Sequence, residues 1–346
     1  MKKYVVGVVG ASGAVGEEIF RVLEERKFPV ARIVPLASER SMGREVEFHS
    51  QHYKILQTTH EVFANEGIEI AFFSAGGSVS AEFAPSAAES GAVVIDNTSY
   101  FRMDKDIPLV VPEVNPQDIA LWKNRGIIAN PNCSTIQMVQ VLYPLHKACK
   151  IKRVDVSTYQ AASGAGKSGM EELVMQMQAF FAFKLDELES TTFPHRLALN
   201  VIPHIDSFMP NDYTKEEMKM INETNKIMNT DFAISATCVR VPVLRSHSES
   251  ISIHFESPLS AKEAKEILSH APGVVLCDDP QEKLYPMPII ATETDQTYVG
   301  RVREDNFDKC ILHLWCVADQ IRVGAATNAV RIAQKWIEMQ KDVGGK

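Results

Sequence analysis

The stretch Tyr4-Val-Val-Gly-Val-Val9, followed at once by Gly10-Ala-Ser-Gly-Ala-Val-Gly16, decides the fold of the first third of the chain. The apolar run has the length and β-branched content of a buried strand. The glycines permit a tight turn and a close approach of the backbone to a phosphate, which the amides of the next helix would bind. Because the spacing is GxxGxxG and not GxGxxG, the motif predicts a nucleotide site only together with its strand and helix.

Outward from this turn, apolar and helical patterns alternate as far as residue 96. Helical patterns cover 17–26 and 79–90, and short apolar runs cover 31–36, 69–74 and 92–96. This alternation predicts an α/β fold whose doubly wound, mostly parallel sheet is covered by helices on both faces.

The pattern changes in the remainder of the chain. Longer strands are expected at 154–160, 236–243 and 250–255, a shorter one at 312–316, and helices at 169–183, 214–228 and 261–269. Without strict alternation they predict an α+β catalytic and dimerisation domain over 131–324. The amphipathic pattern at 328–340 predicts a helix that returns to the first domain. The nucleotide-binding domain is therefore expected to comprise 1–130 and about 325–346.

Composition excludes several classes of protein. The 346 residues are 45% hydrophobic and 23% charged, which is typical of a globular chain. Lysine and arginine number 36 against 44 for aspartate and glutamate, a net charge of −8 that does not suit nucleic acid. No apolar run is long enough to predict a membrane span. The six cysteines have neither CxxC nor zinc-finger spacing, so we expect reduced thiols, no metal and a cytoplasmic location.

The turn after the first strand is the predicted dinucleotide site. Its cofactor-binding residues are expected to be Gly10, Ser12, Gly13, Ala14, Val15 and Gly16. The second strand leads into Glu39-Arg40-Ser41, where a carboxylate would suit the ribose hydroxyl of NAD. Arg40 and Ser41 instead suit a 2′-phosphate by charge and hydroxyl donation, so we predict NADP over NAD. That Arg40 is only a solvated loop cation stays an open alternative.

Cys133 is the candidate nucleophile. It follows a short apolar run within Asn130-Pro-Asn-Cys133-Ser-Thr, just before a helical pattern. Asn132 is a suitable N-cap, which places Cys133 in the first helical turn. The helix dipole and unpaired N–H groups there stabilise a thiolate and would also receive an oxyanion formed by its attack on a carbonyl.

Several motifs together resemble the aspartate-β-semialdehyde dehydrogenase family. They are the glycine turn, Pro131-Asn-Cys-Ser134 and Tyr159-Gln-Ala-Ala-Ser-Gly-Ala-Gly166, then Asn200-Val-Ile-Pro-His-Ile-Asp206, Glu216-Glu-Met-Lys219, and Cys238-Val-Arg-Val-Pro242 with His247-Ser-Glu249. The resemblance runs in order over essentially the whole chain. It implies reduction of L-aspartyl-4-phosphate to L-aspartate-4-semialdehyde with NADPH, through a thioester on Cys133, in the biosynthesis of lysine, diaminopimelate, threonine and methionine. It also implies a homodimer or a dimer of dimers.

The resemblance assigns roles to further residues. His247 matches the acid/base, and Gln160 matches the residue that positions substrate beside the nucleophile. Substrate contacts are implied for Arg240, Glu216, Lys219 and Arg102: the first on the α-carboxylate, the last two on the phosphate, and Glu216 orienting Arg240 or meeting the ammonium. Ser163, Gly164 and Gln320 match positions that line the nicotinamide side.

Three alternatives stay open at this point. N-acetyl-γ-glutamyl-phosphate reductase shares the architecture, but that family generally has Pro-Gly-Cys where this chain has Pro131-Asn-Cys133. A catalytically silent NADP-binding protein is disfavoured because a nucleophile, a base and both anion-binding groups are present. Arg240 and Glu216 alone could also form a structural buried ion pair.

Overall fold

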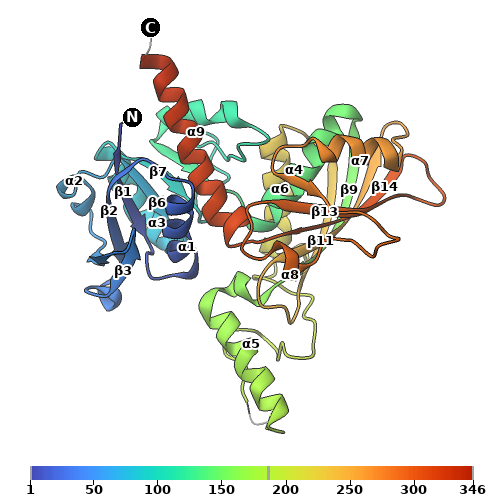
Figure 1. Ribbon diagram of the computed structural model, residues 1–346, viewed down its shortest axis with the longest axis horizontal. Helices are drawn as coiled ribbons and strands as arrows, with labels where there is room; N and C mark the ends of the chain where they lie inside the picture. The colour runs from blue at the N-terminus through green and yellow to red at the C-terminus, as the bar shows by residue number, and fades with distance from the viewer. Residues whose placement is uncertain (1, 185–187, 345–346) are drawn as a thin grey trace. The chain divides into compact units, whose positions relative to one another are not determined.

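The computed structural model describes residues 2–184 and 188–344. The chain divides into two compact units, Met1–Asn132 with Ala325–Lys346, and Cys133–Gly324. The C-terminal segment thus belongs to the same unit as the first third of the chain. Each unit contains a six-stranded sheet (Figure 1).

The sheet of the first unit was predicted to be mostly parallel, and all of its strand pairs are parallel. Its strands lie in the order β5-β2-β1-β6-β7-β8. They comprise β1 Tyr4–Val9, β2 Val30–Ala37, β5 Leu56–Gln57, β6 Ile70–Phe73, β7 Val93–Asp96 and β8 Ile127–Ala129. Because β1 lies between β2 and β6, the strand order reverses beside it, and a crevice opens there at the carboxyl ends of the strands.

Helices cover this sheet. They are α1 Ala14–Glu25, α2 Val62–Asn65, α3 Gly77–Glu89 and α9 Thr327–Gly344, with the 3-10 segments η1 Glu39–Ser41 and η2 Pro116–Asn124. The returning helix α9 was predicted, and its Trp336 ring packs edge-on against Tyr4 and Trp122, at centroid distances of 6.2 and 5.5 Å. Residues from the strands, α1 and α9 share one hydrophobic core.

The first unit also contains an antiparallel hairpin that the sequence analysis missed. Its strands are β3 Glu45–Phe48 and β4 Gln51–Lys54. Phe48 packs edge-on against Phe20 of α1, with ring centroids 6.5 Å apart. β3 alternates strictly but is only four residues long, and β4 is mostly polar, so neither gives a pattern long enough to be recognised.

The sheet of the second unit is mixed and has the order β10-β9-β11-β14-β13-β12. Its strands are β9 Ile151–Gln160, β10 Ala233–Arg240, β11 His247–Phe255, β12 Val274–Leu276, β13 Thr297–Glu304 and β14 Ile311–Ala318. The helices are α4 Cys133–Ala148, α5 Gly166–Phe181, α6 Lys215–Met228, α7 Ala261–Ser269 and α8 Pro288–Ala291, of which α4, α6 and α7 pack on the sheet. This confirms the predicted mixed second architecture.

Two strand bounds differ from prediction in a way that matters for function. β10 ends at Arg240 and does not continue to residue 243, because Pro242 has no backbone N–H to offer the sheet. β11 begins at His247, three residues earlier than expected, because its first side chains are polar although they are buried. Both differences place a functional candidate exactly at a strand terminus.

Candidate active site

Three strand ends meet at one edge of the sheet in the second unit. Gln160 ends β9 and lies opposite Arg240, the last residue of the parallel strand β10. β11 runs antiparallel to β9, so its first residue, His247, lies at the same edge. All three side chains are buried, with exposed fractions of 1%, 6% and 0% in that order. The fold therefore brings together three residues of which the first and last, Gln160 and His247, are 87 positions apart in the sequence.

Cys133 is the first residue of α4 and is half-buried. It lies close enough to Arg240 for the two charges to interact. Gly324 packs directly against it, since a Cβ on Gly324 would lie 2.5 Å from the Cβ of Cys133. The helix N-terminus and the guanidinium both favour a negatively charged sulfur, as predicted for a nucleophile.

The imidazole of His247 is held in one tautomer. Its Nδ1 accepts a hydrogen bond from the backbone N–H of Ala161 at 3.0 Å, so the neutral ring carries its proton on Nε2. That Nε2 is buried, and no group of the described residues forms a hydrogen bond with it. Burial, and then the charge of Arg240, lower the pKa of His247 well below its usual value. At neutral pH the ring is thus an uncharged hydrogen-bond donor.

Arg240 is fixed beside this imidazole. Its Nη1 donates to the carbonyl oxygen of Ala161 at 2.6 Å, and its guanidinium carbon lies 5.9 Å from the ring centroid of Phe193. Burial lowers the pKa of Arg240, an effect that the charges of Glu216 and Cys133 oppose. The remaining guanidinium N–H groups make a suitable site for a carboxylate.

Gly164 keeps the space in front of these two side chains open. A Cβ at this position would lie 2.6 Å from Nη1 of Arg240 and 3.2 Å from Nε2 of His247. Any side chain there would displace one of them. Gly164 was predicted to line the nicotinamide side, and in the second unit it faces Arg240 and His247.

A second group of charged side chains lies on the first turns of α6. Glu216 accepts hydrogen bonds from Nε2 of Gln160 at 3.3 Å and from Nζ of Lys219 at 3.1 Å. Lys219 also bonds Asp206 at 2.8 Å. Burial disfavours the charged amine, but Glu216 and Asp206 outweigh it and raise the pKa of Lys219. The lysine therefore stays a cation at the site.

Asp206 is the member of this group that sequence reasoning missed. It lies in an exposed turn with a left-handed φ of 67°, 13 residues before its partner Lys219. The only available signal was its place at the end of the Asn200-Val-Ile-Pro-His-Ile-Asp206 motif. Nothing in the residue pattern indicates which lysine it meets.

Gln320 and Ser163 are bonded to each other. Nε2 of Gln320 donates to Oγ of Ser163, while its Oε1 accepts from the backbone N–H of Ser246 at 2.8 Å. Gln320 lies in the loop that follows β14. Its amide thus connects this loop to Ser246, directly before β11, and to Ser163 in the 3-10 segment η3 Ala162–Ala165. Contact with a nicotinamide remains a prediction for both residues.

In the first unit, a cavity of about 490 Å³ lies at the carboxyl ends of β1, β2 and β6. It is lined by Gly10, Ser12, Gly13, Ala37, Ser38, Glu39, Gln57, Thr58, Ser74, Ala75, Val79 and Phe83. Its volume is typical of a ligand site. The position matches the crevice at which dinucleotides bind this type of sheet.

The glycine turn forms a cradle that a side chain would fill. Gly10 has φ +91°, and a Cβ there would lie 2.9 Å from the backbone of Ser74. A Cβ on Gly16 would lie 2.2 Å from the carbonyl oxygen of Gly10. The bare backbone fits a pyrophosphate at the start of α1. Ala14 and Val15 are the first residues of that helix.

The residues predicted to select the cofactor lie in η1. Ser41 reaches the glycine turn, with its Oγ 3.2 Å from Oγ of Ser12. Arg40 is exposed, and Glu39 lines the cavity. The structure thus brings Ser41 to the predicted nucleotide site and leaves Arg40 accessible to an added phosphate.

Arg102 lies in the first unit and is 7% exposed. Its Nε donates to the carbonyl oxygen of Asn130 at 2.9 Å, and its Nη2 donates to that of Asn97 at 2.8 Å. The guanidinium therefore supports the backbone three residues before Cys133. Its predicted contact with phosphate remains a prediction.

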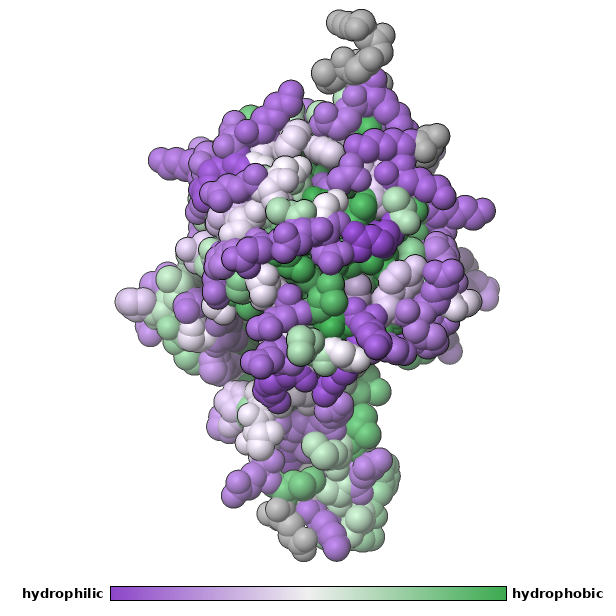
Figure 2. All heavy atoms as spheres, turned by 90° about the vertical axis from the view of Figure 1, so that its left-hand side faces the viewer, coloured by the Kyte–Doolittle hydropathy of each residue, from purple (hydrophilic) through white to green (hydrophobic). Residues whose placement is uncertain are grey.

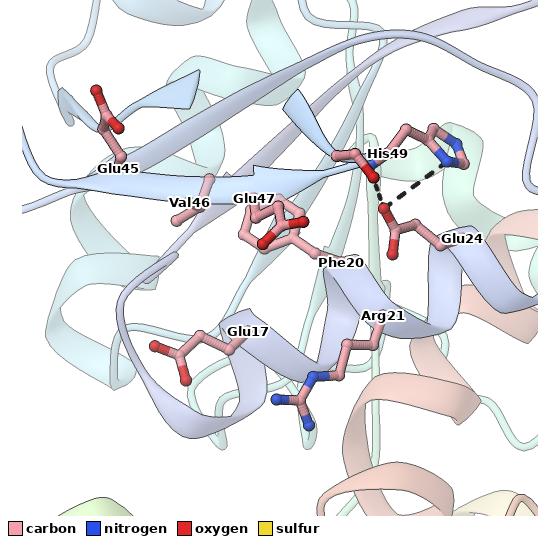
Figure 3. Close-up of a pocket in the computed structure, with 9 residues that line it drawn as sticks. Glu17, Phe20, Arg21, Glu24, Glu45, Val46, Glu47 and His49 are labelled. Atoms are coloured by element: carbon pink, nitrogen blue, oxygen red, sulfur yellow. Dashed lines mark hydrogen bonds and ion pairs between the residues drawn. The ribbon is translucent and has the colours of Figure 1, made fainter. Parts of the chain in front are cut away.

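A hollow of about 620 Å³ between α1 and the hairpin β3–β4 has a different character (Figure 3). Glu17, Glu24, Glu45 and Glu47 line it, with Arg21 as the accompanying cation. Carboxylates of this density repel phosphate, so this hollow does not suit a nucleotide.

In the described part of the chain, no cluster of at least three His, Cys, Asp or Glu residues is arranged to hold a metal. Among the same residues, none of the helices combines the length and apolarity needed to cross a bilayer.

Comparisons with known proteins identify the family. Residues 5–122 match the model of the semialdehyde dehydrogenase NAD binding domain, and residues 142–323 match that of the semialdehyde dehydrogenase dimerisation domain. An aspartate-semialdehyde dehydrogenase of Campylobacter jejuni is 67% identical over 339 residues, which cover 98% of this chain and 99% of that protein. One of Helicobacter pylori is 57% identical over 346 residues, covering 98% and 99%.

A solved structure agrees with these matches. The aspartate semialdehyde dehydrogenase II of Vibrio cholerae, crystallised in complex with ASA, has a TM-score of 0.94 and 46% identity over 98% of this chain and 99% of that one. These similarities do not favour the alternative of an N-acetyl-γ-glutamyl-phosphate reductase. With both family models matched and identities this high, the chain belongs to the aspartate-semialdehyde dehydrogenase family and is an enzyme of amino-acid biosynthesis with an NAD(P)-binding domain.

Proposed function

We propose that the enzyme reduces L-aspartyl-4-phosphate to L-aspartate-4-semialdehyde with NADPH, through a thioester on Cys133. The observation that carries this proposal is the arrangement of Cys133 beside Arg240, whose neighbour His247 has an unpartnered Nε2. Together these residues offer a nucleophile, a carboxylate-binding cation and a hydrogen-bond donor. The Vibrio cholerae relative in complex with ASA supports the same substrate.

Substrate binding follows from the charges at the strand ends. Arg240 binds the α-carboxylate of the substrate, and Glu216 orients Arg240 or meets the ammonium group. Gln160, which is bonded to Glu216, positions the substrate beside Cys133. Lys219, kept cationic by its two carboxylate neighbours, attracts the phosphate. The guanidinium of Arg240 is buried and already held in place, so it can bind the carboxylate through two parallel hydrogen bonds.

The chemistry then proceeds in two steps on Cys133. Its thiolate attacks the acyl carbon, the bond from that carbon to the phosphate oxygen breaks, and phosphate leaves as the thioester forms. NADPH held at the glycine turn of Gly10, Gly13 and Gly16 would supply the hydride for the thioester carbonyl carbon. The Nε2–H of His247 donates to the carbonyl oxygen as negative charge develops on it, and breaking of the C–S bond returns the thiolate.

The test of this function is the reverse assay. L-aspartate-4-semialdehyde, NADP and phosphate are expected to give NADPH, measured by its absorbance, and omission of phosphate is expected to stop the reaction. N-acetylglutamate semialdehyde serves as the comparison substrate. Equal rates without phosphate, or a preference for the N-acetylated substrate, would contradict the proposal.

We further propose NADP and not NAD as the cofactor. Exposed Arg40 is free to pair with a 2′-phosphate, and Ser41 adds a hydroxyl next to the glycine turn. Arg40→Ala is expected to lower kcat/KM for NADP by roughly ten- to a hundredfold, the effect of one charge-assisted hydrogen bond, and to leave kcat/KM for NAD unchanged. The matched control is Arg44→Ala, since Arg44 is also exposed. Equal use of both cofactors, unaffected by Arg40→Ala, would refute the preference.

We also propose that two copies of the chain form a homodimer through the second unit. The sheet face turned away from α4 carries partly exposed Tyr159 and Trp315, whose ring centroids lie 5.2 Å apart. Hydrophobic side chains also gather over α5, visible at the bottom of Figure 2, where Met175 is 51% and Phe181 72% exposed. The matched dimerisation model spans these surfaces.

Light scattering tests the dimer. The expected mass is twice the 38.5 kDa of the chain. Tyr159→Glu is expected to halve this mass, because a desolvated charge on the sheet face opposes association. The matched control is Tyr100→Glu in the first unit, which should leave the mass unchanged. A wild-type mass of one chain at micromolar concentration would refute the dimer.

We place the reaction in the cytoplasm. All six cysteines are free thiols, which suits a reducing compartment. The proposed nucleophile also needs a reduced sulfur. Labelling of fractionated cells with an antibody would test the location.

A further inference from the structure

Glu249 is a buried carboxyl group that the proposed chemistry does not use. It is the third residue of β11, two positions after His247, so both side chains lie on the same face of the sheet. Its exposed fraction is 0%, and among the described residues neither carboxyl oxygen has a hydrogen-bond partner of ordinary length and angle. Its cross-strand neighbours are Thr158 on β9 and Cys316 on β14, both fully buried.

Such an environment favours the neutral acid. An isolated carboxylate without hydrogen bonds is very costly to bury. Burial accordingly raises the pKa of Glu249 well above its usual value, although the adjacent amide of Gln137 opposes this shift. The titratable groups that face it are the thiols of Cys316 on β14 and Cys238 on β10, and burial followed by nearby carboxylates raises the pKa of both. Neither thiol can supply a positive charge that would ionise Glu249.

Gln137 of α4 is the polar side chain beside this carboxyl group. Its Oε1 is also buried without a partner. A carboxylate and an amide oxygen both accept hydrogen bonds and cannot satisfy each other. A protonated carboxyl group, however, donates to Oε1 and gives both buried atoms a partner.

Gln137 connects this contact to the nucleophile. It lies four residues after Cys133 and therefore on the same side of α4, one turn along. Its Nε2 is 3.5 Å from the carbonyl oxygen of His247, to which it donates, and its own carbonyl oxygen accepts from Sγ of Cys316 at 3.8 Å. The first turns of α4 are thus held to β11 and β14 by polar contacts.

We propose that Glu249 is a positioning residue, which donates a hydrogen bond to Gln137 and thereby fixes the start of α4, with Cys133, relative to His247. It acts through Gln137 and touches neither the substrate nor the cofactor. The inference rests on the proposed roles of Cys133 and His247. Its physical basis, a neutral donor between β11 and α4, can be tested independently of any turnover.

Two variants of Glu249 test whether this position needs a neutral hydrogen-bond donor and not a charged carboxylate. Glu249→Gln keeps the shape and can donate from its amide, so kcat should stay within about threefold of wild type. Glu249→Leu removes the donor and leaves Oε1 of Gln137 without a partner, and it should lower kcat by about 100-fold, as expected for a displaced reacting group. The dissociation constant of NADPH should not change in either variant. Gln137→Leu should also lower kcat. In the double variant Glu249→Leu/Gln137→Leu, the loss of kcat should be smaller than the product of the losses in the two single variants.

Two readouts do not depend on turnover. Infrared spectra of the wild type should contain the C=O stretch of a buried protonated carboxylic acid, which Glu249→Gln should remove. The control is Glu172→Gln. Glu172 is 3% exposed, but the backbone N–H groups of Thr191 and Thr192 bind its carboxylate and lower its pKa despite its burial. The band of the protonated acid should therefore persist in Glu172→Gln. The rate of Cys133 alkylation by iodoacetamide should change in Glu249→Leu and not in Glu249→Gln.

Three results would overturn the inference. They are a wild-type kcat in Glu249→Leu, an equal loss in both Glu249 variants, and a wild-type spectrum without the protonated band. If Glu249→Leu fails to fold, the spectrum and kcat of Glu249→Gln still decide. Failure of the proposed function would instead appear as a wild-type enzyme that does not turn over aspartate semialdehyde but retains the band and the alkylation difference.

Discussion

Cys133→Ser is expected to lower turnover in the reverse assay by at least about 10³-fold, the scale for loss of a catalytic nucleophile. A serine hydroxyl at the start of α4 stays protonated at neutral pH, whereas the thiol has a helix N-terminus and Arg240 to favour its ionised form. Binding of NADPH, measured by fluorescence titration, should remain at the wild-type affinity because the glycine turn is unchanged.

The matched control for this experiment is Cys149→Ser. Cys149 follows the other end of α4, is also half-buried, and bonds the hydroxyl and carbonyl oxygens of Ser257. Serine can make the same contacts, so activity should persist. Substantial turnover in Cys133→Ser would remove the covalent route.

Arg240→Lys is expected to lower kcat/KM for aspartate semialdehyde by roughly 2–4 kcal/mol, or about 30- to 1,000-fold. A lysine cannot present two parallel N–H groups to a carboxylate. It would also lose the bond to the carbonyl of Ala161, whose N–H holds the tautomer of His247. Steady-state kinetics with varied semialdehyde measures the effect.

Arg153→Lys is the control for charge-conserving replacement in the same sheet. Arg153 lies on β9, is exposed, and pairs with Asp155, and exposed pairs contribute little. It should change kcat/KM by less than about twofold. A near-wild-type kcat/KM in Arg240→Lys would assign the carboxylate contact to another residue.

The sequence predicted the elements whose pattern is continuous and missed those whose pattern is broken. Buried parallel strands such as β1 and β6 read as uninterrupted apolar runs, because both of their faces are covered. β13 was missed because its alternation shifts at Gly300, so that Val299 and Val302, three positions apart, are both buried. β12, only three residues long, gives no detectable period.

The candidate site likewise contains features that local sequence predicts and features that depend on contacts between distant segments. The place of Cys133 in the first turn of a helix was predictable from its own neighbours, since helix position is a local property. His247 is one of ten histidines, and only resemblance singled it out; its tautomer depends on the backbone of Ala161, 86 positions away. The pairing of Asp206 with Lys219 and the environment of Glu249 likewise arise from packing between distant segments, which no local pattern encodes.

The central claim is that Cys133 carries the acyl group, and mass spectrometry of the intact enzyme and of its peptides tests it most directly. Enzyme mixed with L-aspartyl-4-phosphate in the absence of NADPH should gain the mass of one aspartyl group, located on the peptide that contains Cys133, and addition of NADPH should remove it. An unmodified Cys133 peptide, or an adduct on any other cysteine, would contradict the mechanism.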